Sequence, residues 1–309
     1  MKEAHIPVLL HEVIENLAPK KNKNFVDATC GFGGHAEAIL KEIGPRGVLI
    51  GIDQDNEALE SSRQKLSDFK NRFRAYEGNF SEIDIATRDL KIDGGILADL
   101  GISSYQVDEA SRGFSFAKEG PLDMRMDMSQ ELTAQMVVNG YPVEKLTKIL
   151  RNFADERFAS RIVERIDIAR TKKPIKTTTE LAEIVWDSIP KRYRQKGINP
   201  ATRTFQALRI EVNNELGHLK EFLPKATSLL EPGARIAVIT FHSREDKIVA
   251  NYFKEQAHPC KCPPDFPECV CGLLPKLQIV NRKSIQATEK EMYENPRSRS
   301  ARLRVAEKI

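Results

Sequence analysis

Residues 27–35 read Asp-Ala-Thr-Cys-Gly-Phe-Gly-Gly-His, and this stretch decides the fold class. It ends a short apolar run at 24–29 and opens a helical pattern at 35–43. Glycine lets the backbone approach a ligand closely, and the first turn of a helix has backbone N–H groups without partners inside the helix. A strand, a glycine-rich turn and a helix in this order predict an α/β sheet that binds a ligand at its edge.

The pattern repeats on both sides of a long interruption. Apolar runs that read as strands alternate with segments that read as helices, which predicts a doubly wound, largely parallel sheet. The further predicted strands are 48–52, 72–76, 95–100, 235–241, 276–281 and 301–306. The further predicted helices of this part are 55–68, 204–230 and 244–255.

Between residues 108 and 205 the pattern is helical instead. Leu146, Ile149, Leu150 and Phe153 recur at the spacing of one helix face, and the pair Thr177 and Glu180 resembles a capping box. We therefore expect one α/β domain interrupted by a helical domain. The predicted parts are residues 1–107, the first part of the α/β domain, 108–205, an inserted substrate-recognition domain, and 206–309, the second part.

Two acidic residues bear on which cofactor the glycine turn would bind. Asp53 ends the second strand, where a carboxylate can accept hydrogen bonds from a ribose diol of any adenosine-containing cofactor. The series Gly31, Gly33 and Ala36 formally fits a dinucleotide fingerprint. Asp27, however, would repel a pyrophosphate and could face the cationic end of S-adenosylmethionine. The residues favour S-adenosylmethionine over a nicotinamide dinucleotide.

The end of the strand at 95–100 carries a second group of polar residues. Asp99 is followed by two hydroxyls, an aromatic ring and an amide, contributed by Ser103, Ser104, Tyr105 and Gln106. Acceptors of this kind can hold the protons of an exocyclic amine, and an aromatic ring can stack on a base. A polar turn capped by serine explains the same residues equally well.

Charge and composition narrow the classes of function. The net charge is +4, but residues 151–209 hold 14 Lys and Arg against 7 Asp and Glu, an excess of +7. A basic segment beside an acidic first half predicts a polyanion site next to a small-molecule site. The sequence contains no apolar run long enough for a membrane helix and no apolar signal core at its start. We therefore expect a cytoplasmic protein without a membrane partner.

Four of the five cysteines lie within twelve residues of one another. Cys260, Cys262, Cys269 and Cys271 form two Cys-x-Cys pairs in a proline-rich segment. They could offer four thiolates to a structural zinc ion, or they could be reduced thiols in a surface excursion. The sequence leaves both readings open, and no metal is assigned to the predicted site.

The chain closely resembles the RsmH (MraW) family, whose members methylate N4 of a cytidine in small-subunit ribosomal RNA. The resemblance covers nearly the whole chain. It is carried by residues 5–12, 27–35, 51–53, 79–80, 93–96, 99–106, 112–116, 121–126, 199–210, 241–243 and 295–301. Departures from the family pattern include Tyr105, where proline is common, and Arg244, where leucine is common.

The resemblance implies a Rossmann-like class I methyltransferase with an inserted helical domain and S-adenosyl-L-methionine as methyl donor. It implies 16S ribosomal RNA, within the small ribosomal subunit, as the partner. The cofactor-binding residues it implies are Gly33, Gly34, His35, Asp53, Phe80, Asp99 and Gln106. From the residues themselves, the candidates for holding the reacting amine are Asp99, Ser103, Ser104 and Tyr105.

Two other classes of function stay open from the sequence. One is a nicotinamide-dependent oxidoreductase, and the other is an RNA-binding ribosome-assembly factor that has lost catalysis. The sequence does not identify the group that accepts the proton, the oligomeric state, or whether free RNA or an assembled subunit is the substrate.

Overall fold

A computed structural model describes residues 7–194, 199–263 and 270–309. The chain divides into two compact units. The first combines Met1–Gly101 with Gly217–Ile309, and the second is Ile102–Leu216. No helix among the described residues is long and apolar enough to cross a membrane.

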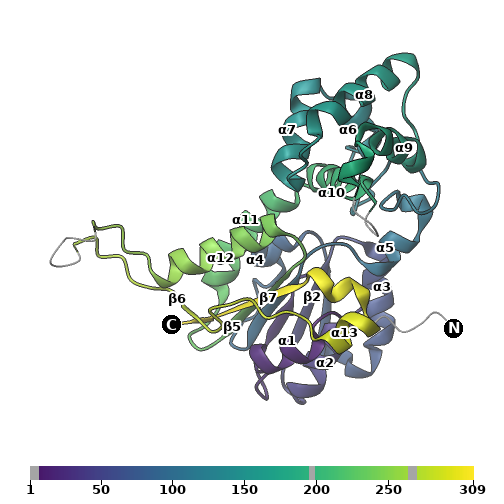
Figure 1. Cartoon of the computed structure of the whole chain (residues 1–309). Helices are drawn as coiled ribbons and strands as arrows, with labels where there is room; N and C mark the ends of the chain where they lie inside the picture. Colours follow the sequence, from purple (N-terminus) through teal and green to yellow (C-terminus); the bar gives the residue numbers. More distant parts are fainter. Residues whose placement is uncertain (1–6, 195–198, 264–269) are drawn as a thin grey trace. The chain divides into compact units, whose positions relative to one another are not determined.

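The first unit is built on a seven-stranded sheet with the order β3-β2-β1-β4-β5-β7-β6. Strands β3, β2, β1, β4 and β5 are parallel, whereas β7 is antiparallel to both of its neighbours. This arrangement confirms the predicted Rossmann-like α/β class. Figure 1 labels β2, β5, β6 and β7 in the sheet. The strands are β1 (Phe25–Asp27), β2 (Leu49–Asp53), β3 (Phe73–Glu77), β4 (Gly95–Asp99), β5 (Arg235–Thr240), β6 (Leu277–Ile279) and β7 (Arg302–Lys308).

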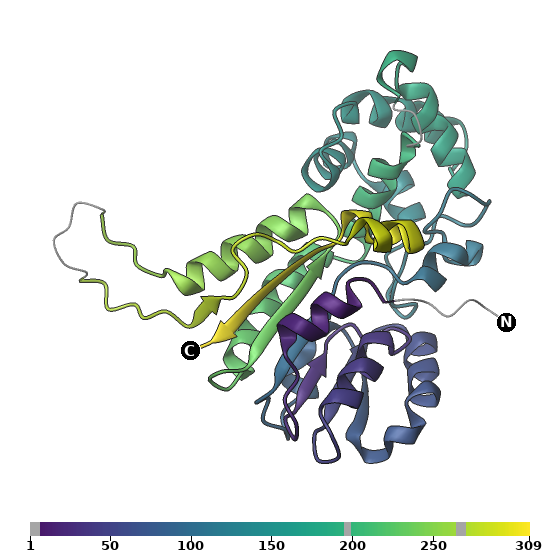
Figure 2. The ribbon, with the colours of Figure 1, turned by 60° about the horizontal axis from the view of Figure 1, so that its bottom comes forward.

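Helices cover both faces of this sheet, as Figure 2 shows from a second direction. Alternate residues of each strand point to opposite faces, so Phe25 packs with α1 and α2 while Val26 packs with α11 and α12. Both faces are buried, which explains the continuous apolar runs of the sequence. The helices of this unit are α1 (Leu10–Leu17), α2 (Gly34–Glu42), α3 (Asn56–Lys65), α4 (Ile83–Ala86), α11 (Glu215–Leu229), α12 (Ser243–Ala257) and α13 (Glu289–Glu294).

The second unit is helical and has its own apolar core. The predicted stripe of Leu146, Ile149 and Leu150 lies buried on α7 and forms part of that core. Thr177 and Glu180 form the predicted capping box at the start of α9. The helices are α5 (Ser104–Asp108), α6 (Ala134–Gly140), α7 (Val143–Ala154), α8 (Ala159–Lys172), α9 (Thr178–Ser188) and α10 (Ala201–Val212).

The prediction of one long helix over 204–230 is wrong. The chain forms α10 and α11 instead, with a break at Asn213 and Asn214. Asn214 adopts a left-handed backbone conformation with φ 47°, which asparagine tolerates better than most residues. The buried Asn213 side chain accepts the N–H of Met126 and donates to the carbonyl of Met124. The Asn213 side chain therefore links the end of α10 by hydrogen bonds to a loop about 90 residues earlier in the chain.

Candidate active site at the carboxyl edge of the sheet

Three adjacent parallel strands each end in an aspartate. Asp27 ends β1, Asp53 ends β2 and Asp99 ends β4, with β1 lying between the other two. Asp27 is in register with Gly51 and Leu97, so Asp53 and Asp99 both lie two residues further toward the carboxyl edge. The carboxyl edge is where open α/β sheets bind ligands. The structure therefore brings the predicted Asp53 and Asp99 to one edge, together with Asp27.

The glycine turn connects β1 to α2 and is fastened to Asp53. The N–H of Gly31 donates to Asp53 Oδ2 at 2.7 Å, and the N–H of Asp55 donates to Asp53 Oδ1 at 2.9 Å. Each carboxylate oxygen can accept a further hydrogen bond. Burial raises the pKa of Asp53 to about 6, although these backbone hydrogen bonds lower it. The side chain is thus held in position with acceptor capacity to spare.

The two predicted glycines have different structural constraints. Gly33 has φ 73°, and a Cβ there would lie 3.1 Å from Leu66 Cδ1. Gly34 begins α2, and a Cβ there would lie 2.4 Å from Pro7 Cγ. Gly33 therefore supplies the backbone conformation of the turn. Gly34 makes room for the chain near the N-terminus, which accounts for that glycine without a ligand.

Asp27 is almost completely buried, with 1% of its surface exposed. Its Oδ1 accepts the N–H of Thr29 at 3.3 Å, whereas Oδ2 has no hydrogen-bond partner among the described residues. Burial raises the pKa of Asp27 to about 7, and the nearby Asp53 adds to the rise. Buried carboxylates are normally paired, so an orphaned oxygen at a ligand-binding edge indicates a missing positively charged or donating partner.

Asp99 ends β4, the strand next to the one that Asp27 ends. Burial, followed by the negative charges of Asp27 and Glu245, raises its pKa well above the usual range. Its Oδ1 is a second buried oxygen without a hydrogen-bond partner among the residues described. The backbone N–H of Asp99 donates to the Thr29 hydroxyl at 2.6 Å, which couples the β4 end to the glycine turn.

His35 joins this edge to the N-terminal segment. Its Nε2 lies 2.9 Å from the carbonyl of Val8, so Nε2 carries the proton and Nδ1 is an acceptor in the neutral ring. Nδ1 lies 3.8 Å from Asp99 Oδ2. The ring is buried, with 6% exposed. These contacts give His35 a structural role, and its predicted role in cofactor binding stays a prediction.

Phe80 follows β3 at the same edge. Its ring packs edge-on against the ring of Phe222, with the two ring centroids 5.3 Å apart. It also packs edge-on against the ring of His218, with the centroids 6.4 Å apart. The preceding Asn79 donates to Gln54 Oε1 at 2.9 Å and contacts His218 Nδ1 at 3.1 Å. Sequence reasoning did not single out Gln54 or His218. His218 comes from α11, 139 residues away, so no local pattern could reveal this contact.

The predicted residues after Gly101 belong to the second unit. Ser103 caps α5: its hydroxyl accepts the N–H of Gln106, and Gln106 Oε1 accepts the N–H of Ser103. Gln106 is buried and Tyr105 is half-buried, while the side chain of Ser104 lies outside the described part of the chain. The structural reading, a polar turn capped by serine, is correct for Ser103. Its hydroxyl keeps a proton to donate, so a catalytic role stays a prediction.

Three arginines of the second unit, Arg112, Arg125 and Arg209, are held by contacts within that unit. Arg112 is buried and donates to the carbonyls of Arg125 and Met126. Arg125 forms a salt bridge with Asp123 at 2.8 Å. Arg209 forms a bidentate salt bridge with Glu215, with N–O distances of 2.7 and 2.8 Å. These contacts stabilise loops and helix ends. Glu215, the first residue of α11, still belongs to the second unit, which ends at Leu216, so all of these pairs lie inside one unit.

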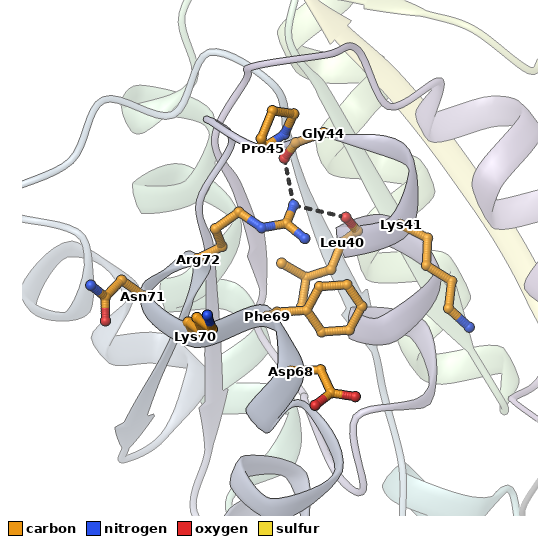
Figure 3. Close-up of a pocket in the computed structure, with 9 residues that line it drawn as sticks. All are labelled: Leu40, Lys41, Gly44, Pro45, Asp68, Phe69, Lys70, Asn71 and Arg72. Atoms are coloured by element: carbon orange, nitrogen blue, oxygen red, sulfur yellow. Dashed lines mark hydrogen bonds between the residues drawn. The ribbon is translucent and has the colours of Figure 1, made fainter.

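A pocket in the first unit lies elsewhere on the sheet (Figure 3). It is lined by the end of α2 and by the residues just before β3, which places it at the amino edge. Arg72 donates there to the carbonyls of Leu40 and Gly44, so its guanidinium closes the end of α2. This pocket does not contain any of the predicted site residues.

The same chain is similar to known methyltransferases along its whole length. A model of the MraW methylase family matches residues 2–309. A protein of Halothermothrix orenii named ribosomal RNA small subunit methyltransferase H is 50% identical over 307 residues, covering 99% of this chain and 98% of the relative. A protein with the same name from Heliobacterium modesticaldum is 48% identical and covers 99% of this chain and 98% of its own length. Another from Clostridioides difficile is 46% identical and covers 100% of both chains.

A solved structure, an rRNA methylase from Streptococcus thermophilus, is similar with a TM-score of 0.44 and 13% identity, covering 99% of both chains. The match to the family model and the identity to the three relatives extend over both units of the fold. The chain belongs to the MraW methylase family.

Proposed function

We propose that this protein transfers a methyl group from S-adenosylmethionine to N4 of a cytidine in 16S ribosomal RNA. The family and the names of its relatives support a ribosomal RNA methyltransferase. The observation that carries the proposal is the trio of strand-end aspartates, two of which have a buried oxygen without a partner among the described residues. The reaction takes place in the cytoplasm, where the small ribosomal subunit is assembled.

The carboxyl edge fits the cofactor. Asp53 has spare acceptor capacity for a ribose diol, and the orphaned Asp27 Oδ2 suits the ammonium of an amino-acid end. S-adenosylmethionine supplies an electrophilic methyl group on a sulfonium. A pyrophosphate would meet repulsion from Asp27, which argues against a nicotinamide oxidoreductase. Further cofactor contacts are proposed for Gly33, Gly34, His35, Phe80, Asp99 and Gln106.

Asp99 and the residues at 103–105 orient the cytosine amine. The amine lone pair is delocalised into the base, so acceptors must hold its protons while the lone pair faces the methyl group. Asp99 Oδ1 is a buried acceptor without a partner among the described residues, and Ser103 and Tyr105 offer hydroxyls. Ser104 completes the proposed set. The methyl transfer is direct, and its acceleration comes mainly from aligning the two reactants.

A covalent mechanism on carbon C5 of the base would need a nucleophilic cysteine. Cys30 is the cysteine nearest to the edge in sequence, and it is buried with 4% exposed. Burial, with the nearby Asp27 and Asp53, raises the pKa of its thiol well above the usual range. A neutral, buried thiol is a poor nucleophile. The proposed target is therefore the exocyclic nitrogen.

The product of the reaction tests the function. Incubation with labelled S-adenosylmethionine and small ribosomal subunits lacking the modification should yield N4-methylcytidine on nucleoside mass spectrometry. Naked 16S RNA in parallel identifies whether the subunit is needed. A 5-methylcytidine product, or a trapped adduct with 5-fluorocytidine RNA, would contradict the mechanism. Binding of RNA with no methyl transfer to either substrate would favour an assembly factor.

Replacing Asp53 by alanine should weaken cofactor binding. A hydrogen bond to a charged group contributes about 1.5–3 kcal/mol, which corresponds to roughly a 10- to 150-fold loss of affinity. Titration calorimetry measures this loss, and a thermal melt checks that the variant is folded. Asp89→Ala is the matched control, because that side chain is 83% exposed and distant in sequence from the turn. Unchanged affinity in folded Asp53→Ala would remove Asp53 from the site.

Cofactor affinity should fall as the pH is lowered through about 7, because protonation of Asp27 removes the charge that holds the ammonium. A carboxyl is about half ionised at its pKa and about one-tenth ionised one unit lower, so the dissociation constant should rise roughly fivefold between pH 7 and pH 6. An α-amino group stays protonated over this range. Calorimetry at the two pH values measures the change. Asp27→Asn should reduce the change to the smaller one that Asp53, with a pKa of about 6, contributes, and equal affinities in the unmodified protein would refute this role.

The basic second unit should carry much of the RNA affinity. Lys172, Lys173, Lys191 and Arg192 are exposed, and replacing all four with glutamine should weaken binding to ribosomal RNA. The salt slope should fall by about 0.7–0.9 for every phosphate that the variant no longer neutralises. A matched variant changes the exposed Lys20, Lys21, Arg46 and Lys91 of the first unit. If filter binding shows the same affinity and slope for both variants, the basic excess only solvates the surface.

A further inference from the structure

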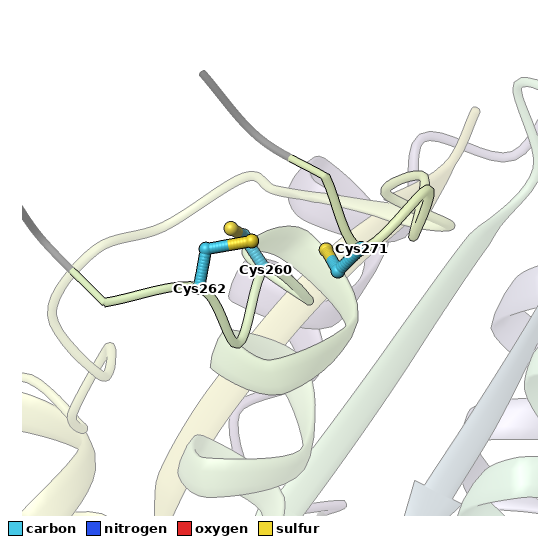
Figure 4. Close-up of side chains that lie close together, drawn as sticks. All are labelled: Cys260, Cys262 and Cys271. Carbon is cyan, nitrogen blue, oxygen red and sulfur yellow. The ribbon is translucent and has the colours of Figure 1, made fainter. Parts of the chain in front are cut away.

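Three cysteines from two separate segments meet beyond the end of α12. Cys260 and Cys262 follow that helix, and Cys271 lies on the returning segment that leads to β6. Their sulfur atoms all lie within 4.8 Å of one another. Figure 4 shows the three side chains gathered between the outgoing and returning segments. The proposed methyl transfer makes no use of them.

The surroundings of this cluster do not resemble a hydrophobic core. Val270 and Leu274 are 73% and 80% exposed, so the described part of the excursion buries few apolar groups here. The N–H of Lys276 donates to the carbonyl of Gln256 at 2.9 Å and closes the base of the excursion. Ordering a chain segment costs conformational entropy, and a segment with little apolar burial needs another source of stability. A metal crosslink would supply it.

The chemistry of the ligands points to zinc. Thiolates are soft ligands that select zinc among the common divalent ions, and a Zn–S distance of about 2.3 Å in a tetrahedron places sulfurs about 3.8 Å apart. The three sulfur atoms, which lie within 4.8 Å of one another, are close enough for this spacing. A disulfide joins only two sulfurs, whereas three converge here. We propose that Cys260, Cys262 and Cys271 bind a zinc ion.

The proposed zinc is structural rather than catalytic. α12 runs away from the carboxyl edge after β5, so its end and the start of β6 lie toward the amino edge of the sheet. The strand-end aspartates lie at the opposite edge. Three thiolates leave one tetrahedral position. Cys269 is the nearest further thiol in the sequence and lies outside the described residues. A Cys269→Ser variant determines whether it is the fourth ligand.

The test measures zinc in the full-length protein purified under reducing conditions without chelators. Elemental analysis should find about one zinc per chain, and chelation should release it. Chain stripped of metal should bind added zinc in competition with a chromophoric indicator. Cobalt in its place should give the strong near-ultraviolet absorption of thiolate-to-metal charge transfer. Protease cleavage within 258–276 should increase when the metal is removed.

Cys262→Ser and Cys271→Ser should each lose the metal and the charge-transfer band. Cys30→Ala is the matched control and should keep both, because Cys30 belongs to the glycine turn. Loss of zinc in Cys269→Ser identifies a four-thiolate site, whereas retention leaves a water or another side chain in the fourth position. Two results would overturn the proposal: metal-free chain that does not take up zinc, or a disulfide among these cysteines in the freshly prepared reduced protein.

Discussion

The register of β2, β1 and β4 brings three carboxyl groups to one edge of the sheet, and the remainder of the site is arranged around them. Carboxylates in a buried position repel one another and lose hydration, so each needs donors or a proton. Asp53 accepts the backbone N–H groups of Gly31 and Asp55, whereas Asp27 and Asp99 each retain an unsatisfied oxygen. Burial raises the pKa of all three carboxyl groups. Such a cluster is costly in the folded protein and indicates a ligand that offers positive charge and donors.

The glycine turn shows how closely binding and folding are connected here. The same carboxylate that is proposed to hold the ribose also accepts the N–H of Gly31, and the N–H of Asp99 uses the hydroxyl of Thr29. His35 then links Asp99 to the carbonyl of Val8. A substitution in the turn therefore alters both the backbone that forms the edge and the groups that face the ligand. For this reason affinity measurements on variants need a parallel measurement of stability.

Local sequence patterns predicted much of this fold and the aspartates of the site. The continuous apolar runs match strands that are buried on both faces of the sheet. The stripe around Leu146 matches a helix that buries one face. What the patterns missed depends on distant contacts. The break at Asn213 is stabilised by loop residues 124–126, and His218 contacts Asn79 across 139 residues of chain. Ser103 fits two explanations equally well, a serine that caps a turn and a hydroxyl that orients a substrate amine. The sequence pattern alone could not distinguish the two.

The position of β7 has a consequence for the order in which the protein can fold during synthesis. β7 lies between β5 and β6 in the sheet, yet it is the last strand of the chain. Until Arg302–Lys308 has been made, the open side of β5 has unpaired backbone groups, and β6 pairs in the sheet only with β7. An exposed strand edge invites pairing with other chains. A nascent chain, or one that lacks β7, therefore presents β5 as an exposed strand edge, and the seven residues of β7 cover that edge.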